Sequence, residues 1–330
     1  MLLASPPVKA APILESAAMP TPSSGSAPIL VTGSHRSGTT WVGRTLATAP
    51  NIAYLDEPFS LRHRRGVLRA RFPCWFPYLH GPESAGVAAD VQRMLAYRYS
   101  YAAELADLRS ARDGGRMVRD AARFARFRRS RSRPLIKDPI AILAVPWLAE
   151  RFGAQPVVLI RHPAAFAASL KRMGWAHDFS HFLRQPGLVD DLVPDLRSDI
   201  EAFAADPPGV VDQAGLLWVI VHTVIDRYRR EHPEWAFARH EDLSTDPFAG
   251  FRTLFEHLGL PYTAGVERYI ADTTGTANAA EAPTGVTHEL RRDSSANVHT
   301  WRNRLDPDEI ERVRARTAAV AAAFYGDDEW

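Results

Sequence analysis

A glycine-rich stretch near the N-terminus, ILVTGSHRSGTTWVGRTL, has the residue types of a phosphate-binding loop. Four residues separate Gly33 from Gly38, and two threonines follow, which is the spacing of the nucleotide-binding P-loop, G-x-x-x-x-G-K-S/T. Thr39, however, stands where the P-loop has the lysine that reaches the β- and γ-phosphates. The glycines let backbone N–H groups approach an anion, and Thr39, Thr40 and Arg36 add further donors. We predict an anion site here; the alternative is an ordinary turn between a strand and a helix.

A second anion site is indicated by Arg161, which ends the apolar run VVLIR. An ATPase or kinase would need an aspartate at the end of such a strand to help hold Mg²⁺. A positive charge there repels a metal ion and attracts an anion, and Ser169, about two helical turns later, adds a hydroxyl. Two anion sites at the carboxyl ends of parallel strands suggest a nucleotide with phosphates at both ends of its ribose, bound without a metal ion.

The elements that must position these residues alternate between strands and helices. Short apolar runs predict strands at residues 28–32, 52–55, 135–136, 157–160 and 235–238. Helices are predicted from Thr39 and over 140–152, 164–172, 210–230, 247–258 and 307–324, with a largely helical segment 83–130 that is broken at Gly114-Gly115. This alternation is typical of a parallel sheet covered on both faces, so we predict an α/β fold, a P-loop-containing three-layer α/β/α domain.

The composition sets the remaining limits. Hydrophobic residues make up 46% of the 330 residues and charged residues 24%, which are ordinary globular values. The net charge of +2 gives no general case for binding nucleic acid. Cys74 is the only cysteine, which suits a reducing compartment, and no apolar run approaches the roughly 20 residues that span a bilayer. We predict a cytoplasmic protein without a transmembrane segment, with a disordered tail at residues 1–27 and a single domain at 28–330.

Four motifs, in order along the chain, resemble those of the sulfotransferases that use 3′-phosphoadenosine 5′-phosphosulfate (PAPS). RSGTTW, which begins at Arg36, resembles their 5′-phosphosulfate loop, and the pair Arg161 and Ser169 matches their 3′-phosphate motif. RHEDL, which begins at Arg239, resembles their R-Y-E-D-L stretch with histidine in place of tyrosine. SANVHTWRNRL, which begins at Ser295, resembles the C-terminal loop that closes over the cofactor. The resemblance spans almost the whole chain after the predicted tail.

The resemblance implies in-line transfer of a sulfuryl group from PAPS to an acceptor hydroxyl, leaving 3′,5′-adenosine bisphosphate (PAP). Because this donor has no β- or γ-phosphate, the P-loop lysine is dispensable, and Arg36 can serve as the cation beside the bridging oxygen. The implied donor-binding residues are Arg36, Ser37, Gly38, Thr39, Thr40, Trp41, Arg161, Ser169, Ser295, Trp301 and Arg302. For Trp301, stacking on adenine and packing in the core remain equal alternatives.

The catalytic requirements are fixed positive charge at the leaving 5′-phosphate and a base for the acceptor proton. Arg36 meets part of the first requirement. Lys137, in LIKDP, resembles the lysine of the N-K-D-P stretch in tyrosylprotein sulfotransferases, which contacts the leaving group. The alternative is a surface lysine paired with Asp138.

The candidate for the base that takes the acceptor proton also comes from the resemblance. Phenol and steroid sulfotransferases carry K-T-H at this place with the histidine as base, but the third residue here is Pro139. Glu57, in YLDEPF, resembles the glutamate of carbohydrate and related bacterial sulfotransferases and is expected at the same sheet edge as the loop. The alternative is a surface carboxylate before a proline turn, with His35, His177 and His181 as further candidates for the base or the acceptor site.

The acceptor is not specified by the sequence. A small molecule, a carbohydrate or a lipid could each present the hydroxyl, and residues 60–115 and 173–210 are expected to form the pocket walls. Arg116, Arg119, Arg123 and Arg126 fall on one helical face, and RRSRSR follows through Arg133. A solvated face is the preferred interpretation, with an acidic partner or membrane surface as the alternative.

Two other functions stay open at this point. One is an ATP-dependent phosphotransferase of the P-loop kinase type with an atypical loop, which would show metal-dependent turnover. The other is a non-catalytic nucleotide-binding module, which would bind PAPS without transferring its sulfuryl group.

Overall fold

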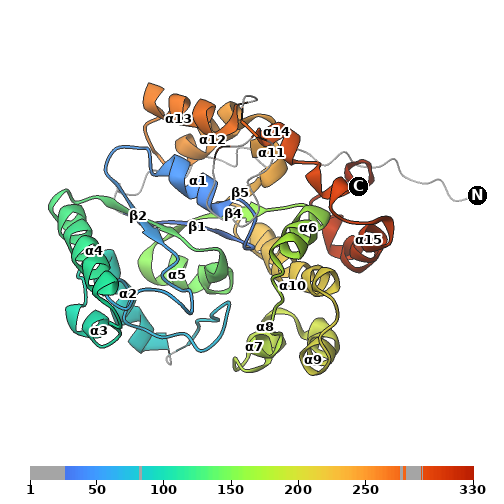
Figure 1. Ribbon diagram of the computed structural model, residues 1–330, viewed down its shortest axis with the longest axis horizontal. Helices are drawn as coiled ribbons and strands as arrows, with labels where there is room; N and C mark the ends of the chain where they lie inside the picture. The colour runs from blue at the N-terminus through green and yellow to red at the C-terminus, as the bar shows by residue number, and fades with distance from the viewer. Residues whose placement is uncertain (1–26, 82–83, 276–277, 280–290, 292) are drawn as a thin grey trace, which may run out of the picture.

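Five short apolar strands form a parallel sheet at the centre of the computed structural model (Figure 1). In sheet order the strands are β2 (Ile52–Asp56), β3 (Arg133–Lys137), β1 (Ile29–Gly33), β4 (Gln155–Ile160) and β5 (Ala236–Arg239). Each predicted strand is found within two residues of its predicted ends. Because every neighbouring pair is parallel, all five carboxyl ends lie at one edge of the sheet.

The structure describes residues 27–330 except 82–83, 276–277, 280–290 and 292. The predicted tail therefore lies outside the described residues apart from Ala27. Within the described part of the chain, no helix combines the length and the apolar character needed to cross a bilayer.

Alternate residues of each strand enter two separate cores. In β1, for example, Leu30 faces one core while Ile29 and Val31 face the other. Helices α1 (Thr39–Leu46), α11 (His240–Thr245), α12 (Pro247–His257) and α13 (Ala264–Thr274) cover the second face. The first face is covered mainly by α2 (Ala85–Leu95), α4 (Ala111–Arg129), α5 (Val145–Phe152), α6 (Pro163–Met173) and α10 (Val210–Glu231). The predicted three-layer α/β/α fold is confirmed (Figure 1).

The remaining helices are short or peripheral, except α15, which packs against α6 and α10. They are α3 (Tyr101–Leu105), α7 (Ser180–Leu183), α8 (Leu188–Leu192), α9 (Arg197–Ala205), α14 (Ser294–Asn297) and α15 (Pro307–Ala321). Single 3₁₀ turns occur at Pro139–Ala144, Pro194–Leu196, Thr300–Asn303 and Asp327–Glu329.

The predicted helix break at Gly114-Gly115 is wrong, because α4 runs through both glycines. The Ser110 side chain caps this helix by accepting from the amide of Asp113, so the helix begins before the glycines. Burial of Phe124 and three neighbouring residues further along the helix offsets the cost of about 1 kcal/mol for each glycine.

Two further sequence predictions need correction. The helix predicted over 140–152 is a 3₁₀ segment followed by α5, because Pro146 lacks an amide donor and is accommodated only in a first helical turn. Arg133, predicted to end the basic run, is instead a buried residue of β3. Its guanidinium donates to the carbonyl oxygens of Ala27 and Leu258, each at 2.7 Å.

Candidate functional site

The glycine-rich loop joins β1 to α1 at the carboxyl edge of the sheet. Gly33 has φ 140°, and a Cβ there would collide with the carbonyl oxygen of Leu159 on β4. Gly38 has φ 94°, and a Cβ there would lie 2.6 Å from Nδ1 of His240. Both positions therefore require glycine. Among the described residues, no side chain caps α1, so the amides of its first turn suit an anion.

Arg36 and the second predicted anion motif meet in one place. Nε of Arg36 donates to the Ser169 hydroxyl at 3.0 Å, and the Arg161 guanidinium donates to the Arg36 carbonyl oxygen. Arg36 has φ 66°, a left-handed backbone conformation that is uncommon for residues other than glycine. Residues more than a hundred positions apart in the chain are thus brought into one cationic group beside the loop.

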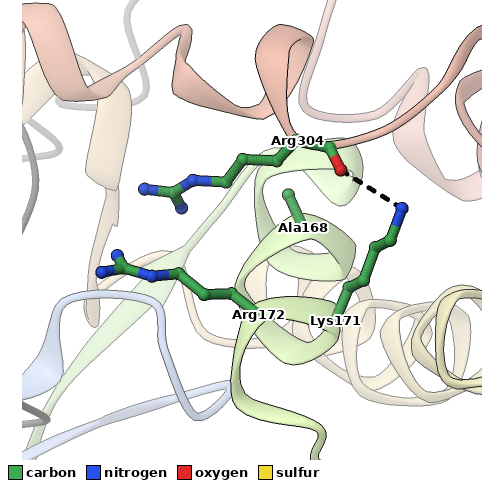
Figure 2. A pocket seen from close by; sticks show the side chains of 4 residues that line it. All are labelled: Ala168, Lys171, Arg172 and Arg304. Atoms are coloured by element: carbon green, nitrogen blue, oxygen red, sulfur yellow. Dashed lines mark hydrogen bonds between the residues drawn. The ribbon is translucent and has the colours of Figure 1, made fainter. Parts of the chain in front are cut away.

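A cavity of about 390 Å³ lies against α6 (Figure 2). Ala168, Lys171, Arg172 and Arg304 line it. The guanidinium groups of Arg172 and Arg304 point to the same side of α6 (Figure 2). Nζ of Lys171 donates to the Arg304 carbonyl oxygen at 3.3 Å and to Glu309 at 2.6 Å, which ties α6 to the C-terminal segment. The cavity is therefore basic, and three of its lining residues lie on the same helix as Ser169.

Sequence reasoning missed Arg172 and Arg304. Arg172 follows Ser169 by three residues, which puts both on the same side of α6, and this spacing was a usable signal. Arg304 lies in the quoted WRNR stretch, but only the tertiary structure shows that it faces α6.

On the other side of the loop, Lys137 is buried at the end of β3, with 2% exposure. Its Nζ lies 2.5 Å from a Glu57 carboxylate oxygen and 2.8 Å from Asp56. Burial opposes the charge on the ammonium, but the two carboxylates outweigh it and raise the pKa of Lys137. The alternative of a surface lysine paired with Asp138 is wrong, because Asp138 is buried and accepts from the Phe59 amide instead.

Glu57 begins the turn after β2, in the left-handed backbone conformation with φ 45°. Its amide donates to the Lys137 carbonyl oxygen at 2.8 Å, which continues the pairing of β2 with β3 by one residue. The side chain of Glu57 is 44% exposed. Its carboxylate therefore reaches a buried ammonium from a position that solvent, and hence an acceptor, can approach.

The histidine candidates are half-buried, and the pKa of each is lowered. Burial, and secondarily Arg36, lower the pKa of His35 to about 4, and the ring packs edge-on to Phe166. Burial lowers the pKa of His177 to about 3. Since a useful general base has a pKa near the working pH, these low values count against both rings as the base. Burial also lowers the pKa of His181, whose Nδ1 accepts from the Trp75 amide at 3.2 Å.

The two segments predicted as pocket walls contact each other. The Gln185 amide donates to the carbonyl oxygen of Phe76 at 3.1 Å, and the Tyr78 hydroxyl donates to Asp191 at 2.9 Å. Phe76 also stacks on Phe182, with ring centroids 5.8 Å apart. Parts of residues 60–115 and 173–210 therefore form one aromatic-lined region.

Among the C-terminal candidates, Trp301 lies against the residue that follows Arg161. Trp301 has 3% exposure and stacks on His162, with ring centroids 5.2 Å apart and planes at 14°. Arg302 donates to the Trp330 carbonyl oxygen at 3.3 Å, and the exposed Ser295 donates to Asp293 at 2.9 Å.

The RHEDL stretch contacts the residue that follows Arg161. Glu241 is buried and accepts from the His162 amide at 3.0 Å and from the Tyr325 hydroxyl at 2.9 Å. Burial raises the pKa of Glu241. These hydrogen bonds fix the turn that follows Arg161, so this motif positions the cationic group.

The residues present fit a donor with two phosphate groups on one ribose. The uncapped first turn of α1 and Arg36 could hold one anion, and Arg161 and Ser169, with the basic cavity on the same helix as Ser169, could hold a second. Such a donor supplies an activated sulfuryl group at its 5′ end.

Comparison with known proteins agrees with this chemistry. The model of the sulfotransferase family matches residues 28–211, more than half of the chain. No curated protein matches at a significant level. The sulfotransferase domain from the curacin biosynthetic pathway is 14% identical, with a TM-score of 0.45, and the match covers 89% of this chain and 97% of that one.

Two further solved structures are similar at the same level. Mouse sulfotransferase SULT7A1 complexed with PAP is 13% identical, with a TM-score of 0.44 and coverage of 92% of this chain and 87% of that one. Sulfotransferase STF9 from Mycobacterium avium is 15% identical, with a TM-score of 0.42 and coverage of 92% and 78%.

Proposed function

The chain belongs to the sulfotransferase family, and we propose that the carboxyl edge of its sheet divides the reaction between the two sides of the glycine-rich loop. The activity follows from the family: a sulfuryl group moves from PAPS to an acceptor hydroxyl, and PAP is the product. Family membership sets aside the kinase and the non-catalytic alternatives. The observation that carries the proposed division is the strand order, which puts β3 and β4 on opposite sides of β1.

On the β4 side the proposed role is to hold the donor. Arg36, the hydroxyls of Thr39 and Thr40, and the first amides of α1 bind the 5′-phosphosulfate. Arg161 and Ser169 bind the 3′-phosphate, and the cavity against α6 supplies the guanidinium groups of Arg172 and Arg304. Two phosphates close together need this density of positive donors.

On the β3 side the proposed role is to move the proton and stabilise the leaving group. Glu57 accepts the proton of the acceptor hydroxyl. The Lys137 ammonium has three donors, and Asp56 and Glu57 occupy two of them within the described residues. The third is proposed to face the leaving 5′-phosphate, where negative charge grows as the sulfuryl group departs. The same ammonium orients the Glu57 carboxylate.

The acceptor is proposed to be a partly apolar molecule that carries a hydroxyl. The support is the aromatic region formed by Phe76, Phe182 and their neighbours, next to His35 and therefore next to the loop. We also infer that residues 28–330 act as one domain, because the loop, Lys137 and Arg161 all follow strands of a single sheet. A cytoplasmic location is proposed from the unpaired thiol of Cys74, the only cysteine.

The test is transfer itself. The full chain is incubated with PAPS labelled in its sulfuryl group and with panels of phenols, lipid alcohols and sugars, and products are identified by a mass gain of one SO₃. Transfer to apolar or aromatic hydroxyls in preference to free sugars is expected. Transfer to free sugars alone would refute the proposed acceptor class and leave the family assignment intact.

A further inference from the structure

The outward face of α4 carries a row of arginines. Four residues point into the core: Asp120, Ala121, Phe124 and Phe127. On the opposite side, Arg112, Arg119 and Arg126 are exposed and recur every seven residues. Because seven residues are almost two full helical turns, the three side chains lie nearly in line, over about 21 Å.

In the part of the chain that the structure describes, no carboxylate pairs with the arginines of this row. The nearby acidic residues each pair with another side chain: Glu104 with Arg64, Asp107 with Arg71, Asp113 with Arg116, and Asp120 with Arg123. Among the ion pairs of the described chain, none includes Arg112, Arg119, Arg126 or Arg129. The whole chain has a net charge of only +2, so this face is a local concentration of positive charge.

Apolar side chains lie beside the row. Val118 on α4 is 65% exposed, and Tyr101 and Leu105 on the adjoining α3 are 56% and 55% exposed. These are three of the five exposed large hydrophobic residues in the described part of the protein. Small residues separate the arginines, since Gly115 and Ala122 are exposed as well. The face therefore combines unpaired positive charge with exposed apolar groups.

This surface is distinct from the catalytic edge. Figure 1 shows α3 and α4 at one end of the molecule and α6 and α15 at the other. The face is therefore separate from the cavity of Figure 2, which α6 lines. The binding of the donor does not account for it.

We propose that the outer face of α3 and α4 docks on a membrane that contains anionic phospholipids. The arginine row matches the negative surface potential of such a membrane, and Tyr101, Leu105 and Val118 enter the headgroup region between the arginines. A soluble polyanion would satisfy the arginines but would offer the three apolar side chains no apolar phase. This inference is independent of the proposed catalytic roles.

The experiment is sedimentation of the full chain with vesicles of phosphatidylcholine, with and without phosphatidylglycerol, at low and physiological salt. The test variant changes Arg112, Arg119 and Arg126 to Gln. The control changes Arg312, Arg314 and Arg316 on α15 to Gln, which removes the same charge from side chains that pair with Asp212, Asp327 and Asp199. Equal melting temperatures and PAP affinities establish that all variants are folded.

The wild type and the control are expected to bind only the anionic vesicles, more weakly as salt rises. The test variant should lose on the order of a hundredfold in vesicle affinity, because each arginine near an anionic surface contributes roughly a factor of five. No binding by the wild type at low salt, or equal binding by the test variant, would overturn the proposal.

Val118→Ser separates a membrane from a soluble polyanion. It should weaken vesicle binding by a few-fold and leave binding to heparin, the soluble polyanion used as probe, unchanged. If Val118→Ser leaves vesicle binding unchanged while heparin competes it away, the face binds polyanions through charge alone, and the membrane assignment is wrong.

Discussion

The two sides of the glycine-rich loop differ in how their charges are balanced. On the β3 side, the protein itself balances the buried ammonium of Lys137 with the carboxylates of Asp56 and Glu57. On the β4 side, the guanidinium groups of Arg36 and Arg161 contact a hydroxyl and a carbonyl oxygen, and further cations line the cavity against α6. This difference supports the proposal that one side moves a proton and the other receives the negative charge of the donor.

The largest effect is expected from Glu57→Gln. Gln keeps the shape and a hydrogen bond to Lys137 but cannot take a proton, so kcat should fall about a thousandfold while PAP affinity changes little. Single-turnover transfer and calorimetry measure the two quantities. Asp56→Asn, which alters the other carboxylate on the same ammonium, is the control and should keep kcat within about tenfold. Near wild-type turnover in Glu57→Gln would return the role of base to the histidines.

Lys137→Ala should lower kcat by about a hundredfold or more, because one fixed donor to the leaving group is lost. PAP affinity should stay within a few-fold, since the charge that Lys137 stabilises develops only in the transition state. A loss of PAP affinity as large as the loss in kcat would mean that Lys137 holds the donor, and the division between the two sides would not stand.

Arg161→Ala tests the proposed 3′-phosphate contact on the β4 side. It should weaken PAP by about ten- to a hundredfold and hardly change the affinity for 5′-AMP, which lacks the 3′-phosphate. Calorimetric titration of both ligands distinguishes the two effects. Equal losses would show that Arg161 acts by holding the Arg36 carbonyl oxygen, and so supports the loop and not the 3′-phosphate. Arg172→Gln should shift the same ratio in the same direction.

On the β4 side, the lowered pKa of His162 should make the free energy of unfolding depend on pH. Burial, then the neighbouring Arg239 and Arg302, lower the pKa of His162 to about 3. The unfolded chain protonates this histidine near its ordinary pKa of about 6.5, so the free energy of unfolding falls as pH drops below that value. At pH 5 the loss from His162 alone is about 2 kcal/mol.

His162→Phe removes this titration and keeps the stacking on Trp301. Neither ring nitrogen of His162 has a hydrogen-bond partner within the described chain, so the phenyl ring leaves no group unsatisfied. Urea unfolding at pH 7 and pH 5 should show a smaller acid loss, by about 2 kcal/mol, in the variant. An unchanged acid loss would mean that His162 is protonated in the folded protein.

Removal of divalent metal ions should have no effect on transfer. Since Thr39 replaces the P-loop lysine and Arg161 stands where an aspartate would hold Mg²⁺, transfer should be unchanged by EDTA. Activity that EDTA abolishes and Mg²⁺ restores would place a metal ion at the leaving group and reassign the role of Lys137.

The sequence predicted the strands well, because each is a short apolar run with clear ends. It did not predict their order, since the pairing of β3 with both β1 and β2 joins residues far apart in the chain. The motifs identified Arg36, Arg161 and Ser169 but not their mutual contacts. Those contacts depend on the meeting of the loop, the end of β4 and the second turn of α6.

The environment of Lys137 shows a different limit. The sequence left a surface position open as the alternative for this lysine. Its burial is decided by packing beneath α1, where a Cβ on Gly43 would lie 3.0 Å from Cγ of Lys137. Arg133 is misjudged for the same reason, because the carbonyl oxygens that bury its charge belong to residues 27 and 258. Local sequence patterns do not reveal which distant groups will stabilise a buried charge.

The insertion of β3 between β1 and β2 has a consequence for how the chain folds during synthesis. The first two strands to leave the ribosome share no backbone pairing, and Ile29 finds its partner only in Leu135 or Gln155, more than a hundred residues later. Both strands therefore stay unpaired until β3 has emerged. Such non-local pairing makes folding slow and leaves unpaired strand edges exposed to other nascent chains, so this protein should depend on chaperones for as long as its first 137 residues are still being made.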